Sequence, residues 1–229
     1  MAIEYSVHAP IGFDERPVLH CIRSVHEAGG RVTRVRLYQP ETGDRQGEAR
    51  SREAVETLRD IMRALGAEVE VTRVEITPII KPIIRAYKLL YRDLGHPGLH
   101  IAACLSSGMR PLVIALYTAL LSLPQEVQKR VRICIEPEGM PEKRFFIPLT
   151  HLTTLQRLLR DEHVADVLEA IVSAGGATFA ELYKKITSVD SPARNISRSK
   201  LYRMLQKLVE EGILVKSEEG GVYKLAERY

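Results

Sequence analysis

Residues 99–110 read Leu-His-Ile-Ala-Ala-Cys-Leu-Ser-Ser-Gly-Met-Arg, and they anchor the assignment of a fold to most of the chain. The first seven residues are almost continuously apolar, which is typical of a strand covered on both faces. Ser106–Arg110 follow as a short loop, and Pro111–Leu123 then has the composition and length of a buried helix. A buried strand, a loop and a helix in this order predict a parallel sheet with helices packed against it.

The same alternation continues on both sides of this stretch. Helical spacing begins after Asp14, which we expect to cap the first helix, and the region Gln39–Gly47 has the composition of a polar turn. The prediction for residues 1–149 is an α/β fold, a mostly parallel sheet with helices on both faces. Five more strands are expected at Ile3–Ala9, Val32–Tyr38, Ala67–Ile76, Val131–Ile135 and Arg144–Leu149, and two more helices at Ala49–Leu65 and Pro78–Leu94.

Two loops of this fold are candidates for ligand binding. In such sheets, ligands bind at the carboxyl ends of the strands, which places Pro10–Arg16 and Ser106–Arg110 at the expected site. Small residues, two hydroxyls, a guanidinium and a helix N-terminus in the second loop favour an anion or a nucleotide phosphate. The same residues also fit an ordinary strand-to-helix turn. Neither GxGxxG nor GxxxxGK[ST] occurs, which disfavours an ordinary dinucleotide or nucleoside triphosphate site.

The character of the chain changes after about residue 150. Residues 150–160 read as a short amphipathic connector, and residues 161–229 as a second domain. Three helices are expected there, followed by two short strands around the pair Gly220-Gly221, which suits a tight hairpin. This is the order of a winged helix-turn-helix, a fold that places one helix in the major groove of DNA. The helices are expected at Asp161–Ala174, Phe179–Ile186 and Ser197–Glu211, and the strands at Ile213–Lys216 and Val222–Leu225.

The third helix of this domain concentrates positive charge. No acidic residue occurs from Ser191 to Val209, although the rest of the domain is fairly acidic. Double-stranded DNA is therefore the expected partner, since basic side chains contact phosphates and Arg and Gln can read base edges. A solvated basic helix on a dimerisation or RNA-binding module is the alternative. The candidate DNA-binding residues are Arg194, Arg198, Ser199, Lys200, Tyr202, Arg203, Gln206 and Lys207, with Lys216 and Lys224 on the wing.

Composition narrows the class of protein. The 229 residues are 45% hydrophobic with a net charge of +4 and a pI near 9.0, as in a folded protein that can accept an anionic partner. Cys21, Cys104 and Cys134 lack CxxC spacing and a nearby His, so we expect buried free thiols and neither a disulfide framework nor a metal site. The longest uncharged apolar run, Pro111–Gln125, is too short for a membrane span, and no secretory signal is visible. The expectation is a cytoplasmic protein without a cofactor.

The run Cys104–Arg110 resembles the signature loop of CARF domains, the CRISPR-associated Rossmann-fold ligand sensors. Gly12-Phe13-Asp14-Glu15 is similar to the first ligand loop of that family. A CARF domain followed by a winged helix resembles the archaeal CRISPR-associated transcriptional regulators. The resemblance implies a Rossmann-like fold, a homodimer built through the CARF domains, and a cyclic oligoadenylate, most often cyclic tetra-adenylate, bound in the dimer pocket. The ligand-binding residues that it implies are Ile11, Gly12, Phe13, Asp14, Glu15, Ser106, Ser107, Gly108, Met109, Arg110, Glu138 and Gly139.

No residue is assigned a catalytic role. Some CARF domains cleave their own ligand, so the alternative function is a ring nuclease whose winged helix serves dimerisation. Ser107 and Arg110 could then orient the ligand and stabilise charge, and His8 lies near the first loop. A third possibility is a regulator that senses an unrelated metabolite.

Overall fold

The computed structural model describes residues 2–137, 140, 143–188, 195–217 and 220–226. The chain divides into two compact units, Met1–Thr150 and His151–Tyr229.

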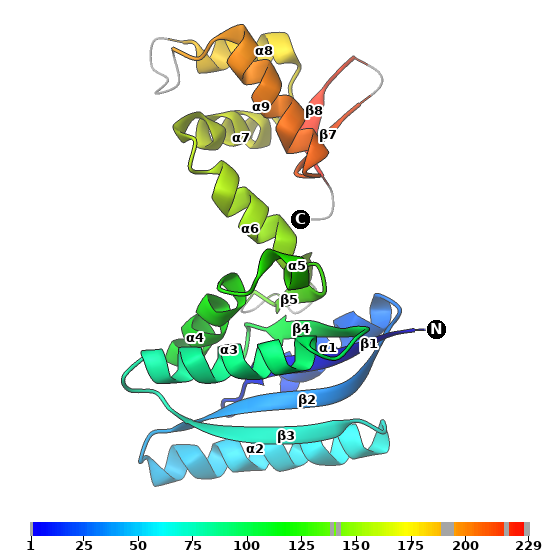
Figure 1. The fold of residues 1–229 in the computed structure, drawn as a ribbon, viewed down its shortest axis with the longest axis vertical. Helices are drawn as coiled ribbons and strands as arrows, with labels where there is room; N and C mark the ends of the chain where they lie inside the picture. The colour runs from blue at the N-terminus through cyan, green and yellow to red at the C-terminus, as the bar shows by residue number, and fades with distance from the viewer. Residues whose placement is uncertain (1, 138–139, 141–142, 189–194, 218–219, 227–229) are drawn as a thin grey trace. The chain divides into compact units, whose positions relative to one another are not determined.

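The first unit is built around a six-stranded sheet with the strand order β3-β2-β1-β4-β5-β6 (Figure 1). Strands β1 to β5 are parallel, and β6 pairs antiparallel with β5. The strands are β1 (Ile3–Pro10), β2 (Gly30–Glu41), β3 (Glu68–Glu75), β4 (Leu99–Cys104), β5 (Val131–Ile135) and β6 (Phe145–Pro148). The helices are α1 (Arg16–Glu27), α2 (Arg45–Ala64), α3 (Ile80–Leu94), α4 (Arg110–Leu121) and α5 (Gln125–Gln128).

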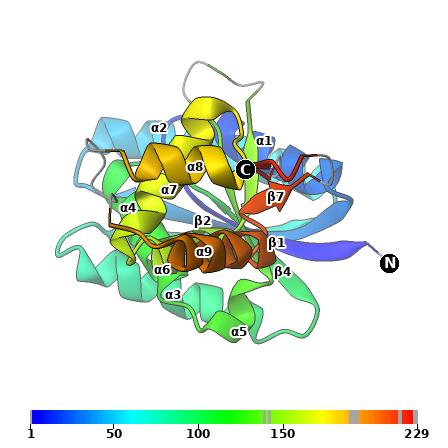
Figure 2. The ribbon, with the colours of Figure 1, turned by 90° about the horizontal axis from the view of Figure 1, so that it is seen from above.

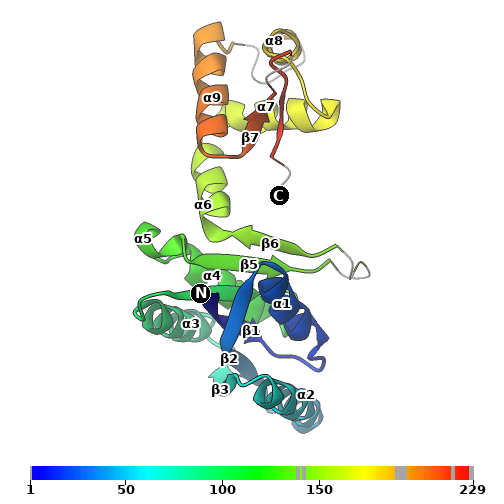
Figure 3. The same ribbon diagram turned by 90° about the vertical axis from the view of Figure 1, so that its right-hand side faces the viewer.

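Helices cover both faces of this sheet, as predicted. Figure 3 shows α1 and α2 on one side and α3 and α4 on the other. The alternation of side chains along β1 explains the arrangement, because successive residues of a strand point to opposite faces. Tyr5, Val7 and Ala9 enter the apolar core with α1 and α2, whereas Ser6 and His8 contact Asp93 of α3.

The order of the strands creates a crevice. The chain runs from β1 to β2 and β3 in one direction, then crosses to β4 on the other side of β1. The carboxyl ends of β1 and β4 are therefore the switch point, where the loops that follow diverge and leave room for a ligand.

The expected polar turn at Gln39–Gly47 is wrong in part. Strand β2 continues to Glu41 because β3 extends past the end of β1 and pairs with Gln39 to Glu41. Helix α2 begins early, since the Asp44 side chain accepts a hydrogen bond from the backbone N–H of Gln46 at 3.1 Å.

The second unit contains helices followed by a two-stranded antiparallel sheet. Its core is formed by apolar side chains of the last three helices, including Val167, Leu182 and Leu205, together with Tyr223. Thr178 and Glu181 form a capping box at the start of α8, and the chain passes from α9 into β7 (Figure 2). The elements from the end of β6 onward are α6 (Leu149–Leu158), α7 (Glu162–Ala174), α8 (Phe179–Ile186), α9 (Arg198–Glu210), β7 (Leu214–Lys216) and β8 (Tyr223–Leu225). Helix α6 thus occupies most of the expected connector.

Candidate functional site

A cavity of about 970 Å³ opens at the switch point of the sheet, and we name it the switch-point cavity. It is bounded by the loops that follow β1, β4 and β5 and by the first turns of α1, all within the first unit. Its volume lies at the upper end of the range for small-molecule sites. The lining residues are Gly12, Phe13, Asp14, Arg16, Pro17, His20, Ser106, Ser107, Gly108, Met109, Glu136 and Pro137.

Two glycines let the loops after β1 and β4 approach each other closely. Gly108 has φ +83°, and a Cβ there would lie 2.5 Å from the Cβ of Pro10. A Cβ on Gly12 would lie 3.2 Å from the Cα of Gly108. Since both the backbone angle and the space at Gly108 exclude a side chain, only glycine fits there without strain.

The two serines of the quoted stretch hold the loops together. Ser107 Oγ donates to the carbonyl of Pro10 at 2.5 Å, and the side chain is buried. Ser106 Oγ accepts from the backbone N–H of Glu136 at 2.5 Å. The hydroxyl of Ser107 is therefore committed to the loop, whereas Ser106 retains a proton that it can donate.

Ionisable side chains line the cavity in two pairs. Arg16 Nη2 and Asp14 Oδ2 are 2.6 Å apart, and the hydrogen bond from Arg16 lowers the pKa of Asp14. His20 Nδ1 and Glu136 Oε2 are also 2.6 Å apart. Asp14, expected as the cap of the first helix, lies one residue before the N-cap Glu15, and its side chain accepts the backbone N–H of Arg16, the first residue of α1, at 3.0 Å.

Two helix N-termini border the cavity. Pro17 lies in the first turn of α1, and Met109 is the N-cap of α4. Neither N-cap side chain accepts a hydrogen bond, and neither first turn contains an acidic residue. At α1, the Asp14 side chain already accepts the backbone N–H of Arg16 at 3.0 Å and Pro17 has no N–H, so it is the N-terminus of α4 that favours a negatively charged ligand here.

The structure brings most of the expected ligand residues into the cavity. Ile11 is an exception, since its side chain is fully buried in the core, and so are Glu15 and Arg110, which are not among the lining residues. Arg110 is exposed at the first position of α4. Glu138 and Gly139 lie outside the described residues. The seven that line the cavity are Gly12, Phe13, Asp14, Ser106, Ser107, Gly108 and Met109.

Phe13 is 56% exposed, so part of its side chain is accessible. The guanidinium of Arg50 lies 5.0 Å from the centre of the ring, within the range of a cation–π contact. An aromatic ring in this position can stack on a base.

Sequence reasoning placed Arg16 at the end of an expected ligand loop without naming it as a contact, and it missed His20 and Glu136 as lining residues. His20 and Glu136 are 116 positions apart in the chain, so no local pattern could pair them. His8, considered above for its place near the first loop, points away from this site. It is fully buried between Tyr38 and Asp93 on the opposite face of β1.

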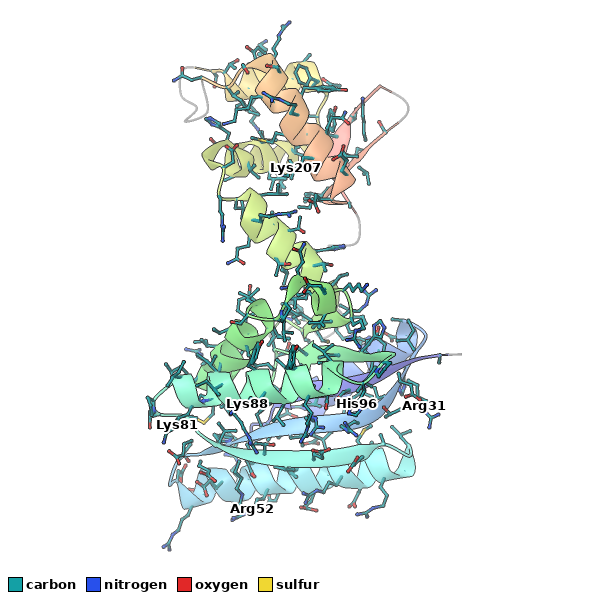
Figure 4. The ribbon with its side chains drawn as sticks, viewed as in Figure 1. Arg31, Arg52, Lys81, Lys88, His96 and Lys207 are labelled. Carbon is teal, nitrogen blue, oxygen red and sulfur yellow. The ribbon has the colours of Figure 1, made fainter. Side chains whose placement is uncertain are left out.

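In the second unit, the basic residues of α9 lie on several sides of the helix. Arg198 stacks over Tyr183 of α8 at 5.1 Å, and Tyr202 packs edge-on against Phe179. On another side, Lys200 pairs with Asp161 at 3.3 Å. A groove of about 390 Å³ on that side is lined by Arg157, Leu158, Asp161, Val164, Lys200, Arg203, Met204 and Lys207, the last of which is labelled in Figure 4.

The other candidate DNA-binding residues are also at the surface. Ser199 is exposed and Gln206 is half-buried on α9. Lys216 of β7 lies over the ring of Tyr223, and Lys224 of β8 is exposed. Arg194 lies outside the described residues.

Cys21, Cys104 and Cys134 are buried free thiols, as expected. Within the part of the chain that the structure describes, His, Cys, Asp and Glu side chains form no group that could hold a metal ion. None of the helices described there is long and apolar enough to cross a membrane.

Comparison with known proteins identifies the first unit. The family profile described as "Csa3 CRISPR-associated Rossmann-like domain" matches residues 5–148, and no curated protein matches. Similar solved structures include Can2 from Sulfobacillus thermosulfidooxidans in complex with cyclic tetra-adenylate (TM-score 0.44, 10% identity, 98% of this chain and 61% of that one). Csm6 from Enterococcus italicus, bound to cyclic hexa-2′-fluoro-hexa-dAMP, gives a TM-score of 0.49 at 13% identity, over 93% of this chain and 57% of that one.

Protein VC1899 from Vibrio cholerae gives a TM-score of 0.40 at 11% identity, over 96% of this chain and 61% of that one. The chain thus spans about three fifths of the length of the solved structures that it matches. Because the family profile covers more than half of the sequence and nearly all of the sheet, the chain belongs to the family with the Csa3 CRISPR-associated Rossmann-like (CARF) domain.

Proposed function

We propose that this protein is a CRISPR-associated transcriptional regulator. It acts as a homodimer, binds a cyclic oligoadenylate, cyclic tetra-adenylate in particular, in its switch-point cavities, and binds operator DNA through its C-terminal unit. The switch-point cavity is the observation that carries this proposal, and membership of the CARF family fits it.

The chemistry of the cavity suits a ring of adenylates. The N-terminus of α4 favours phosphates, and Arg16 adds a guanidinium that is 75% exposed. The exposed ring of Phe13 offers a stacking surface for adenine, and Gly108 and Gly12 allow close contact with the backbone.

An apolar surface on α3 and α4 supports a homodimer. We name it the α3–α4 face: it consists of Ile80, Ile84 and Tyr91 on α3 with Ile114 and Tyr117 on α4, all exposed. Helix α4 carries no charged residue after Arg110. The basic residues Lys81 and Lys88, labelled in Figure 4, follow a separate stripe on α3.

A second copy packed on the α3–α4 face would exclude this apolar surface from water. An isologous dimer with a two-fold axis beside α4 would also place two cavities close together, which suits a ring with matching symmetry. Ile114→Lys is therefore expected to convert a dimer into a monomer in light scattering. Leu65→Lys, at an equally exposed site at the end of α2, is the matched control.

The C-terminal unit has the helix and hairpin order of a winged helix-turn-helix, and the cations of α9 and of β7 and β8 support DNA binding. Ligand can regulate DNA binding only if the ring binds one arrangement of the dimer better than another.

Calorimetric titration with cyclic tri-, tetra- and hexa-adenylate tests the proposal. We expect one ring to bind tightly, with one ring per dimer, and the same protein to shift promoter DNA in a gel. Absence of binding to every ring would overturn the sensor, and absence of any DNA shift would overturn the regulator.

A further inference from the structure

The groove beside Lys200 in the second unit, which we name the α6–α9 groove, has a volume of about 390 Å³. It lies between the last turn of α6, the start of α7 and one side of α9. Its floor is apolar, since Leu158, Val164 and Met204 are each at most 8% exposed. Four cations and one carboxylate complete the lining, namely Arg157, Lys200, Arg203, Lys207 and Asp161. This excess of positive charge favours an anionic occupant.

Two of the four cations already belong to ion pairs. Lys200 Nζ lies 3.3 Å from Asp161 Oδ1, and each side chain is 40% exposed. Arg157 donates to the carboxylate of Glu211 through one of its terminal nitrogens. Because a guanidinium has five N–H donors, Arg157 keeps donors for a ligand after this pairing.

The other two cations are free of carboxylates. Arg203 and Lys207 are exposed, and neither has a carboxylate partner among the described residues. Arg203 Nε donates to the carbonyl of Ser199 at 3.3 Å, which leaves its terminal nitrogens available. Both residues lie on the same side of α9 as Lys200, since positions three and four apart are neighbours on a helix.

A phosphate of the DNA backbone is the anion that this side of α9 would meet. An α-helix with its side chains is about 10–12 Å wide, and the major groove of DNA is about 12 Å wide. A helix that lies in the major groove therefore has a phosphate backbone along each of its two sides. Arg198 and Tyr202 contact α8 on one side of α9, and the α6–α9 groove follows another.

Arg157 stands on a rigid support. Leu158 belongs to the core of the second unit, and Leu155 packs against that core. The last turn of α6 is thereby held in place, and the guanidinium of Arg157 is 49% exposed at the groove. A cation over an apolar floor is also less screened by salt than one surrounded by water.

We propose that the α6–α9 groove binds a phosphate of the DNA backbone and that Arg157 of α6 contacts this phosphate, an inference that rests on the proposed function. Cations from two helices, α6 and α9, then hold the phosphate together. The DNA interface extends beyond the helix-turn-helix onto α6, which begins at Leu149 directly after β6. The element that carries the chain out of the first unit thus takes part in DNA binding.

The experiment measures DNA binding of the purified full chain by fluorescence anisotropy over a salt series. One duplex carries the promoter sequence, and the other is an unrelated sequence of equal length. Arg157→Ala removes the contact, and Arg157→Lys keeps the charge. Glu211→Gln breaks the same ion pair from its other side. Arg160→Ala, at an exposed position that does not line the groove, is the matched control.

We expect Arg157→Ala to weaken binding to both duplexes about fivefold, because a phosphate contact carries no sequence information. The slope of log K against log salt should fall by about 0.9, the value for one phosphate, and Arg157→Lys should keep the slope of the wild type. Glu211→Gln should bind DNA at least as tightly as the wild type, since it frees Arg157 and removes a negative charge. Arg160→Ala should stay within about twofold of the wild type. Ring binding should be unchanged in every variant.

Equal losses in Arg157→Ala and Glu211→Gln would assign Arg157 to the ion pair alone. A loss confined to the promoter duplex would assign it to sequence recognition, and equal binding by Arg157→Ala and Arg160→Ala would remove the phosphate contact and leave the regulator standing. Calorimetric binding of pyrophosphate at constant ionic strength with a Kd below about 10 µM, lost in Arg157→Ala, would assign the groove to a free phosphate ligand instead of DNA. If the wild type binds neither duplex, the proposed function and this inference fail together.

Discussion

Polar side chains gather at two places along strand β1, on its α3 side and at its carboxyl end. The two places differ in how completely these side chains are hydrogen-bonded. On the α3 side of the sheet, Asp93 accepts hydrogen bonds from Ser6, His8 and Arg36, and all four residues are at most 3% exposed. At the carboxyl end of the same strand, the switch-point cavity keeps the exposed guanidinium of Arg16, which bonds Asp14, and the Nε2 of His20, which has no hydrogen-bond partner among the described residues. A buried, densely hydrogen-bonded network stabilises the sheet, whereas accessible groups that are only partly paired remain available to a ligand.

The protonation states in the buried network are fixed by burial and hydrogen bonding. Burial lowers the pKa of His8 and raises that of Tyr38, so the Tyr38 hydroxyl donates to a neutral imidazole at Nδ1 over 2.7 Å. Burial opposes ionisation of Asp93, but hydrogen bonds from His8 and Arg36 outweigh it and hold the pKa of Asp93 well below its usual range. Arg36 Nη2 also bonds Asp93 Oδ1 at 2.8 Å.

Removal of Asp93 should have the largest effect on stability, and it tests directly whether the buried network stabilises the sheet. Asp93→Ala leaves the guanidinium of Arg36 buried without its main partner, and we expect the free energy of unfolding of the first unit to fall by about 3–5 kcal/mol. Hydrogen exchange of the β1 and β2 amides measures this unit separately from the other.

Asp60→Ala is the matched control, because the ion pair of Asp60 with Arg63 is exposed. This substitution should lower the free energy of unfolding by less than about 1 kcal/mol. Similar losses in the two variants would show that burial of the network does not set its contribution.

Gly108→Ala should have the next largest effect, and it acts at the cavity. The added Cβ would meet Pro10 at 2.5 Å, and φ is +83°. We expect a strain of about 1–3 kcal/mol and ring binding weakened at least about tenfold, measured by calorimetry.

Gly43→Ala separates backbone strain from steric overlap, since Gly43 has φ +76° but no atom within 4 Å of an added Cβ. This variant should show a similar backbone strain and leave ring binding unchanged. Equal binding by both variants would mean that the approach of the two loops is not needed by the ligand.

The buried network also predicts a dependence of stability on pH. The pKa of His8 is lowered by folding. Below about pH 6.5 the imidazole is therefore protonated in the unfolded state but remains neutral in the folded state. Stability is then fully present above that pH and is lost as the pH falls, by at most about 1.4 kcal/mol per pH unit for one group.

The slope of stability against pH should be reduced in His8→Gln and kept in His26→Gln, whose side chain is exposed. Burial also lowers the pKa of His100, which contributes with the same sign, so some slope should remain. An unchanged slope in His8→Gln would assign the pH dependence to other groups.

The alternation of strands and helices was predictable from sequence because each element has its own spacing of apolar residues and is bounded by residues, such as Gly and Pro, that end strands and helices. The stretch 99–110 marks both a buried strand and the loop at the switch point, and seven of the twelve expected ligand residues line the cavity. The side chain of Ile11 lies in the core and not in the cavity, because a loop residue next to a strand can continue the core.

Residues paired over long distances could not be predicted. His20 meets Glu136 only because α1 packs beside β5, and Asp93 meets His8 only because α3 covers β1. The extension of β2 to Glu41 depended on a partner strand, β3, rather than on the local composition of Gln39–Gly47. Tertiary pairing therefore decides these features, and a single sequence carries no signal for it.

The smallest expected effect extends the contrast between paired and unpaired groups to α9. Arg203 has no carboxylate partner among the described residues, whereas Lys200 is paired with Asp161. If DNA contacts come from groups that the fold leaves free, Arg203→Ala should weaken DNA binding by roughly fivefold to tenfold, and the slope of log K against log salt should fall by about one phosphate contact. Lys200→Ala should weaken DNA binding less, because the Lys200 ammonium must first separate from Asp161 before it can contact a phosphate. Ring binding should stay unchanged in both variants. A larger loss in Lys200→Ala, measured by fluorescence anisotropy over a salt series, would show that this ion pair opens onto DNA and that pairing in the free protein does not identify the residues that bind.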